Sequence, residues 1–194
     1  MKVIVLSEHG DQEAKLGISL SYNTEVDAKK LADVAMKLAH KGEGHNKFLE
    51  SMAVWLDVDA PRYWWQQFDT YRVGVTKQSE STMHTMTKRL LTQEDFSHHM
   101  SAGHLSTLNL WIDQGKWNTV KWNLPESFLQ RRIVCLNYMA LQRIIRQRIT
   151  HRLVEWQDFI KQVLEQVEYP RYLVKNEGVS QETLALYSLE DIQQ

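Results

Sequence analysis

The sequence predicts an α+β fold, in which a mixed or antiparallel sheet packs with long helices in a single domain. Short runs of Val, Ile and Leu near the start and a period-two run at 52–58 are typical of strands. Longer segments with apolar residues three and four positions apart are typical of amphipathic helices. The length of 194 residues, 43% hydrophobic and 24% charged, fits one compact domain and excludes disordered and fibrous proteins. We expect this domain to cover residues 1–175, followed by a polar, peripheral segment at 176–194.

The N-terminal part of the chain predicts two strands and a helix. The apolar segments 3–6 and 14–20 flank a turn-like Glu-His-Gly-Asp sequence, so both are expected to be strands. Residues 24–42 begin with a capping pattern at Thr24, continue with apolar residues at helical spacing and end at Gly42, which predicts an amphipathic helix.

The next segment predicts a strand that leads into a helix. Residues 52–58 alternate with a period of two, which is typical of a strand with one buried face. Pro61 suits the first turn of a helix capped by Asp59 and running to about residue 71. The polar stretch 76–123 is expected to hold short helices and loops.

The C-terminal part predicts two further helices. We expect a helix over 126–148, because 133–141 is apolar on all sides except at Asn137. A buried amide must be hydrogen-bonded, so Asn137 either caps a helix or joins a core network, or it contacts a ligand. Thr150 can cap a helix whose apolar stripe ends at Tyr169-Pro170.

Basic residues gather in one stretch, although the formal charge of the whole chain is only −1. Between 121 and 152 a single acid, Glu126, accompanies the following basic residues: Lys121, Arg131, Arg132, Arg143, Arg146, Arg148 and Arg152. Arginine binds phosphate and carboxylate groups through paired hydrogen bonds, so the stretch indicates an anionic ligand. The alternative is ion pairing with acidic helices of the same or a neighbouring subunit. Nucleic-acid binding is a third and less favoured hypothesis, because the rest of the chain is acidic.

Several site classes find no support in the sequence. The histidines are not spaced as zinc ligands, so no metal site is expected, and no phosphate-binding glycine loop or nucleophile elbow is present. The one cysteine, Cys135, lies in an apolar run and is expected to be a buried, inert thiol. With no segment long enough to span a bilayer or form a signal peptide, we expect a soluble intracellular protein without membrane partners.

Several segments taken together resemble the flavin-dependent thymidylate synthase family. In that family a histidine is followed by a strand, a proline-started helix and the signature Arg-His-Arg, seven residues, then Ser. Three fragments match in order and with ungapped internal spacing. The first, Leu16-Gly17-Ile18-Ser19-Leu20-Ser21-Tyr22, is similar to a short family strand that ends in Ser-Tyr. The second comprises His45 to Glu50, Ala60-Pro61 and Gln67 to Arg72, and the third comprises Leu124-Pro125, Asn137 and Arg148.

The resemblance implies a fold, an activity and a set of site residues. It implies that the chain transfers a one-carbon unit, as a methyl or hydroxymethyl group, to C5 of a deoxyuridine nucleotide. FAD would be the cofactor, with NADPH and methylenetetrahydrofolate as co-substrates, in a cytoplasmic homotetramer. Among the site residues, the flavin would contact His45, Arg72 and Asn137, and the nucleotide would contact Gln67, Lys121 and Arg148, with Arg148 catalytic at the pyrimidine.

This chain departs from the family pattern at several of these positions. Thr70-Tyr71-Arg72 replaces Arg-His-Arg, and Glu80 stands at the signature serine, so Ser79 and Ser81 on either side are the candidates for its catalytic place. Thr82 occupies the position of a phosphate-binding arginine. Lys121 replaces an arginine that binds the nucleotide phosphate in the family, and Arg143 replaces what is often a polar flavin contact. The alternative to an active enzyme is therefore a catalytically inactive nucleotide-binding module on the same scaffold.

Overall fold

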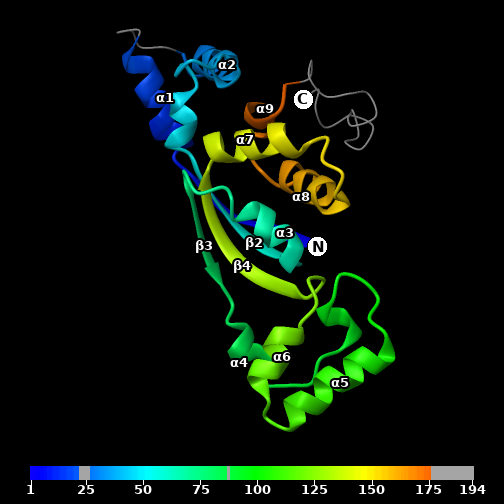
Figure 1. The fold of residues 1–194 in the computed structure, drawn as a ribbon. Helices are drawn as coiled ribbons and strands as arrows, with labels where there is room; N and C mark the ends of the chain where they lie inside the picture. Colours follow the sequence, from blue (N-terminus) through cyan, green and yellow to red (C-terminus); the bar gives the residue numbers. More distant parts are fainter. Residues whose placement is uncertain (22–26, 87, 176–194) are drawn as a thin grey trace.

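The computed structural model describes residues 1–21, 27–86 and 88–175 of the chain. Their centre is one antiparallel sheet with the strand order β1-β2-β4-β3 (Figure 1). The strands are β1 (Lys2–His9), β2 (Ala53–Pro61), β3 (Val75–Ser79) and β4 (Leu129–Asn137). The predicted α+β fold with an antiparallel sheet and long helices is confirmed.

The helices lie between and after the strands. In chain order they are α1 (Asp11–Leu20), α2 (Ala28–Ala39), the short 3-10 helix η1 (Lys47–Glu50), α3 (Arg62–Phe68), α4 (Thr82–Met86), the 3-10 helix η2 (Gln93–Asp95), α5 (Ala102–Asp113), α6 (Trp117–Asn123), α7 (Tyr138–Arg148), α8 (Val154–Leu164) and α9 (Pro170–Leu173). None of these helices is both long enough and apolar enough to cross a bilayer.

One face of the sheet forms the main hydrophobic core. Val54 and Leu56 of β2 point to this face and are fully buried, because α3 and α8 pack against it (Figure 1). Trp64 of α3 lies 4.7 Å from Trp156 of α8, measured between ring centroids. Trp55 alternates to the opposite face and is 37% exposed.

A second, smaller core lies at the far end of β3 and β4. Helices α4, α5 and α6 enclose it, and they extend away from the rest of the molecule in Figure 1. Its buried members include Leu108, Val120 and Phe128. The predicted short helices and loops of 76–123 are present here, but the strand β3 in the same stretch was not predicted.

Residues 14–20 were predicted as a strand, and this prediction is wrong. They belong to helix α1, where Ala14 and Ile18 are buried while Leu16 and Leu20 are 61% and 74% exposed. The buried pair is spaced four residues apart, which is one helical turn. Gly10, at a φ of +94°, allows the chain to turn from β1 into this helix.

The helix predicted over 126–148 is also wrong in its first half. Residues 129–137 form β4, and only Tyr138–Arg148 is helical. A continuous apolar run fits a buried helix and a central strand equally well. Val134 and Leu136 are buried, whereas Cys135, which was predicted to be a buried thiol, is only partly buried because it alternates to the opposite face of the sheet. Here the run lies between β2 and β3 and pairs with both, so the ladder hydrogen bonds decide the outcome.

The other predicted elements need smaller corrections. The strands at 3–6 and 52–58 and the helix within 24–42 are confirmed, while Thr24 lies outside the described residues. Asp59 lies inside β2 rather than capping α3, which follows Pro61. The helix after Thr150 is confirmed as α8, but it begins at Val154 without a side-chain cap. The segment 176–194 lies outside the described residues, so the domain limits stay a prediction.

Candidate functional site

Two residues predicted to hold the nucleotide meet in the structure. Gln67 near the end of α3 and Arg148 at the end of α7 are 81 positions apart, yet Arg148 Nη1 donates to Gln67 Oε1 at 3.3 Å. The indole Nε1 of Trp156 donates to the same oxygen at 2.9 Å. Gln67 Oε1 is therefore occupied by two donors, which leaves the amide Nε2 as the group that Gln67 can offer to a ligand.

Aromatic rings and a phenol surround the Arg148 guanidinium. Tyr71 Oη accepts from Arg148 Nε at 2.7 Å and donates to Gln147 Oε1 at 3.0 Å. The guanidinium carbon lies 4.8 Å from the Trp156 ring centroid and 5.5 Å from that of Tyr71. No carboxylate pairs with Arg148 among the described residues, so the guanidinium keeps its full charge for a ligand.

A histidine adds a further neutral group beside this pair. His151 Nδ1 accepts from the backbone N–H of Leu153 at 3.1 Å, so in the neutral ring Nε2 carries the proton. Burial and the charge of Arg148 lower the pKa of His151. The cluster of Gln67, Tyr71, Arg148 and Trp156, which we call the Gln67–Arg148 site, thus presents N–H donors and suits a ring edge that carries carbonyl oxygens.

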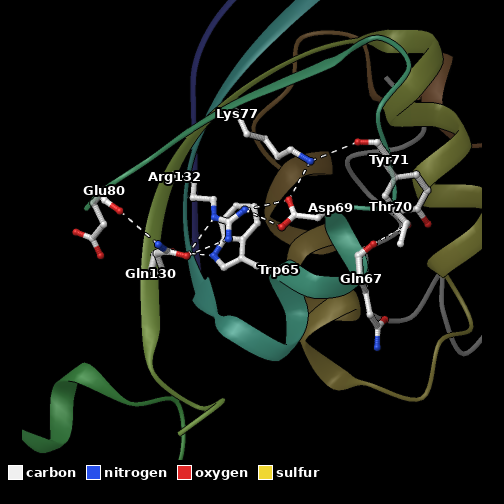
Figure 2. Close-up of polar contacts among 9 residues, drawn as sticks. All are labelled: Trp65, Gln67, Asp69, Thr70, Tyr71, Lys77, Glu80, Gln130 and Arg132. Atoms are coloured by element: carbon white, nitrogen blue, oxygen red, sulfur yellow. Dashed lines mark hydrogen bonds and ion pairs between the residues drawn. The ribbon is translucent and has the colours of Figure 1, made fainter. Parts of the chain in front are cut away.

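Next to this site, one carboxylate joins three elements (Figure 2). Asp69, just after α3, accepts from Arg132 of β4 at 2.9 Å and from Lys77 of β3 at 2.9 Å. Arg132 also stacks on Trp65, with 4.3 Å between the guanidinium carbon and the ring centroid. Lys77 reaches the carbonyl oxygen of Tyr71 at 3.4 Å, so the same network holds the loop that carries Tyr71.

The network determines the pKa of Asp69. Burial raises the pKa of this carboxyl group, but the hydrogen bonds and charges of Lys77 and Arg132 outweigh burial and hold it below its ordinary value. Asp69 is therefore ionised at neutral pH, and it links α3, β3 and β4 as one charged unit.

Glu80, at the position of the family's serine, is directed toward β4. Its carboxylate accepts from the backbone N–H of Arg131 at 3.2 Å, and its carbonyl oxygen accepts from Gln130 Nε2 at 3.3 Å. Of the two neighbouring candidates, Ser79 is exposed at the end of β3, and the Ser81 hydroxyl lies 3.5 Å from the backbone N–H of His84 in α4. The structure does not bring either serine into contact with Gln67 or Arg148.

Lys121, the third predicted nucleotide residue, lies apart from the other two. It contacts the hydroxyl of Thr82, which is buried, and it has no hydrogen bond to Gln67 or Arg148. Burial, followed by the charge of Arg62, lowers the pKa of Lys121. In the part of the chain that the structure describes, no carboxylate pairs with this ammonium group, so it remains available to an anion.

Asn137 is the N-cap of α7. Its Oδ1 accepts from the backbone N–H of Ala140 at 2.8 Å, which agrees with the helix-capping alternative. Gly74, at a φ of +71°, lies against this amide, and a Cβ added there would be 2.8 Å from Asn137 Nδ2. The close approach requires glycine and leaves Nδ2 as the free donor of Asn137.

The segment that holds His45 lies at the end of the sheet where β4 leads into α7. Its neighbour Asn46 donates to Met139 Sδ at 3.5 Å, which places this segment beside the first turn of α7. His45 itself is exposed and lines a cavity of about 670 Å³ between α1, α2 and residues 43–51. Asn137 and Arg72 do not line this cavity, so the three predicted flavin residues lie on adjoining segments without sharing one pocket.

Two arginine side chains in this region, Arg72 and Arg143, lack a carboxylate partner among the described residues. The Arg72 side chain is exposed and has no hydrogen bond or ion pair with any other described residue, while the Arg143 guanidinium donates, within the described part of the chain, only to the carbonyl oxygen of Val73, at 3.2 Å. Guanidinium groups without a carboxylate partner are suited to phosphate oxygens. Arg72 and Arg143 are therefore available to an anion such as a phosphate group, and His45 and the Asn137 amide are further donors on the adjoining segments.

The basic stretch at 121–152 divides between the two predicted roles. Arg131 pairs with Asp57 at 2.6 Å, and Arg132 pairs with Asp69, so these two form ion pairs, but with a strand and a turn rather than with the expected acidic helices. Arg143 and Arg148 have only neutral partners, as the ligand hypothesis expects. Groups of histidine, cysteine and acidic side chains that could hold a metal ion are absent from the described residues.

Sequence reasoning missed two members of the Gln67–Arg148 site. Trp156 belongs to the apolar stripe of α8, and the stripe pattern indicates only burial. Tyr71 is visible in the sequence only as a replacement for the signature histidine. Its contact with Arg148 depends on how α3 and α7 approach each other, which no local pattern indicates.

Comparison with known proteins gives a fold. No protein-family model and no curated protein sequence matches the chain. Among solved structures, it is similar to thymidylate synthase X (ThyX) from Helicobacter pylori with FAD and dUMP, with a TM-score of 0.77 and 16% identity over 91% of this chain and 98% of that one. A second structure, flavin-dependent thymidylate synthase ThyX from Helicobacter pylori complexed with FAD and dUMP, gives a TM-score of 0.76 and 17% identity over 91% and 99%. The chain therefore has the fold of these synthases.

Proposed function

We propose that the chain is a flavin-dependent thymidylate synthase-like enzyme that transfers a one-carbon unit to C5 of a deoxyuridine nucleotide. The observation that carries the proposal is the contact between Gln67 and Arg148, because the family resemblance assigns both residues to the nucleotide. Their remaining groups are N–H donors, which match the carbonyl oxygens of a uracil ring.

The residues of the chain would contribute binding and electrostatics to this reaction. Arg148 would stabilise negative charge that develops on the pyrimidine, and a preorganised interaction of this kind can supply about 3–4 kcal/mol. Lys121 would bind the nucleotide phosphate. Ser79 and Ser81 stay candidates for the place of the signature serine.

FAD would be held by His45, Arg72, Arg143 and Asn137. When bound, FAD supplies the hydride equivalents of the reaction. NADPH is the proposed reductant and methylenetetrahydrofolate the proposed one-carbon donor, in keeping with the family resemblance. The two ThyX structures from Helicobacter pylori that share this fold contain FAD and dUMP.

We further propose a cytoplasmic homotetramer. Apolar side chains on the sheet face opposite the main core support an assembly, since Leu6 is 51% and Trp55 37% exposed. Trp122, beside Lys121 in α6, is 77% exposed. A single cysteine agrees with a reducing compartment. Sedimentation equilibrium of the full chain tests the assembly.

An absorbance spectrum of the purified protein, before and after addition of FAD, tests the binding part of the proposal. A thermal shift with deoxyuridine monophosphate is then measured with and without FAD. We expect bound flavin and a rise in melting temperature, because a ligand that binds only the folded state stabilises it. Protein that neither binds FAD nor responds to the nucleotide would refute both proposed sites.

The second candidate is a nucleotide-binding module without turnover. The observation that favours it is that residues replacing the family's binding side chains contact other protein side chains. Tyr71 bonds to Arg148, and Thr82 contacts Lys121. Stabilisation by the nucleotide without any flavin binding would support this candidate over the enzyme.

A further inference from the structure

We propose that Tyr71 is a positioning residue, whose phenol fixes the Arg148 guanidinium so that Nη2 stays available to the nucleotide. This inference rests on the proposed function of the Gln67–Arg148 site. Tyr71 stands where the family signature has a histidine, so its role is inferred from the contacts of this chain.

The geometry defines the orientation of the phenol. Tyr71 Oη accepts from Arg148 Nε at 2.7 Å and donates its own hydrogen to Gln147 Oε1 at 3.0 Å, so both of its hydrogen bonds have a consistent direction. Tyr71 is only 6% exposed. The ring packs edge to face on Phe68 and Trp156, with centroid separations of 6.0 and 6.2 Å, so the phenol oxygen has a fixed place.

The same contacts determine which edge of Arg148 is free. Nε bonds Tyr71 and one N–H of Nη1 bonds Gln67, and the Trp156 ring lies against the guanidinium. Among the described residues, no acceptor bonds to either N–H group of Arg148 Nη2. An arginine side chain has many rotamers in water, so holding it before the ligand arrives lowers the entropic cost of binding.

A neutral partner is the important chemical feature of this arrangement. A carboxylate in place of the phenol would hold Arg148 more strongly, but it would also neutralise the charge that a polarised pyrimidine needs. Tyr71 and Gln67 accept hydrogen bonds without carrying charge at neutral pH. They orient the guanidinium and leave its electrostatic effect on the ligand intact.

The test compares Tyr71→Phe with Tyr169→Phe, which removes a phenol hydroxyl bonded to Glu168 outside the site. Binding of deoxyuridine monophosphate is measured by calorimetry. We expect affinity to fall about tenfold in Tyr71→Phe and to stay unchanged in Tyr169→Phe. In an Arg148→Ala background, Tyr71→Phe should have no further effect, because the phenol acts through the guanidinium. An equal additional loss in that background would overturn the proposal.

A ligand-independent measurement keeps the inference testable if the proposed function fails. The Nε–H resonance of Arg148 is identified by its loss in Arg148→Lys, and its exchange with water is measured in the wild type and in Tyr71→Phe. We expect slow exchange in the wild type and exchange at least tenfold faster in the variant. Equal exchange rates in the two proteins would overturn the positioning role. If the rates differ as expected but the wild-type protein does not bind the nucleotide, only the proposed function is overturned.

Discussion

Replacement of Asn137 separates its role as a helix cap from its proposed contact with the flavin. The structure shows Oδ1 bonded to the backbone N–H of Ala140 at 2.8 Å, while Nδ2 lies beside Gly74. Asn137→Ala removes both groups. Asn137→Asp keeps an acceptor at the start of α7, removes the Nδ2 donor and adds a negative charge.

The expected loss of stability follows from the cap and its surroundings. Loss of a capping side chain costs about 1 kcal/mol, and the gap left beside Gly74 adds to this, so we expect about 1.5 kcal/mol for Asn137→Ala. For a domain of this size the melting temperature should fall by about 3–6 °C. Asn137→Asp should stay within about 0.5 kcal/mol of the wild type, because a negative charge is favourable at a helix N-terminus.

Calorimetric unfolding and FAD titration of both variants provide the assay. We expect FAD affinity to fall at least about tenfold in Asn137→Asp, because the donor is lost and a negative charge is added near the proposed diphosphate site. Equal destabilisation by Ala and Asp would refute the capping argument. Wild-type FAD affinity in Asn137→Asp would refute the flavin contact.

Three further variants test other parts of the account. Gly74→Ala should destabilise the protein by at least about 1 kcal/mol in thermal unfolding, since its φ of +71° and the 2.8 Å approach to Asn137 both disfavour a Cβ; unchanged stability would contradict this. Asp69→Asn should lower stability at pH 7 and should do so progressively less as the pH falls below about 4. The folded-state pKa of Asp69 is depressed, so its contribution is fully present above the unfolded pKa of about 3.9 and is lost as the pH falls through the folded value; a difference in urea unfolding that does not change with pH would contradict the ion-pair network. Lys121→Met should weaken deoxyuridine monophosphate about tenfold or more and leave deoxyuridine binding unchanged in calorimetry, and an equal loss for both ligands would argue against a phosphate contact.

The elements with clear periodicity could be predicted from the sequence. The alternation at 52–58 and the apolar stripe of α8 each depend on one face packed against the core, so their local patterns are sufficient. The segment 133–136 is apolar on both faces of a central strand although only Val134 and Leu136 are buried, and an apolar run of this kind is indistinguishable from that of a buried helix. Strand β3 lies at the sheet edge with alternate exposed residues, and its polar sequence VTKQS gives no apolar signal.

The candidate site shows a similar division. Gln67 and Arg148 could be identified through their spacing in the family pattern, and the structure places them in contact. The positions of Tyr71 and Trp156 beside them follow from the packing of α3 against α7 and α8, which is a tertiary property. The direction of the Glu80 carboxylate toward β4 depends on the pairing of β3 with β4, which the sequence did not indicate.

The most direct test of the account is the conversion of deoxyuridine monophosphate by the purified chain supplied with FAD, NADPH and methylenetetrahydrofolate, followed by mass spectrometry. The account predicts a nucleotide that carries one additional carbon at C5, and it predicts that Arg148→Ala, while still folded, yields none. Absence of this product from wild-type protein that binds both FAD and the nucleotide would contradict the proposed enzyme and leave a binding module on the synthase fold.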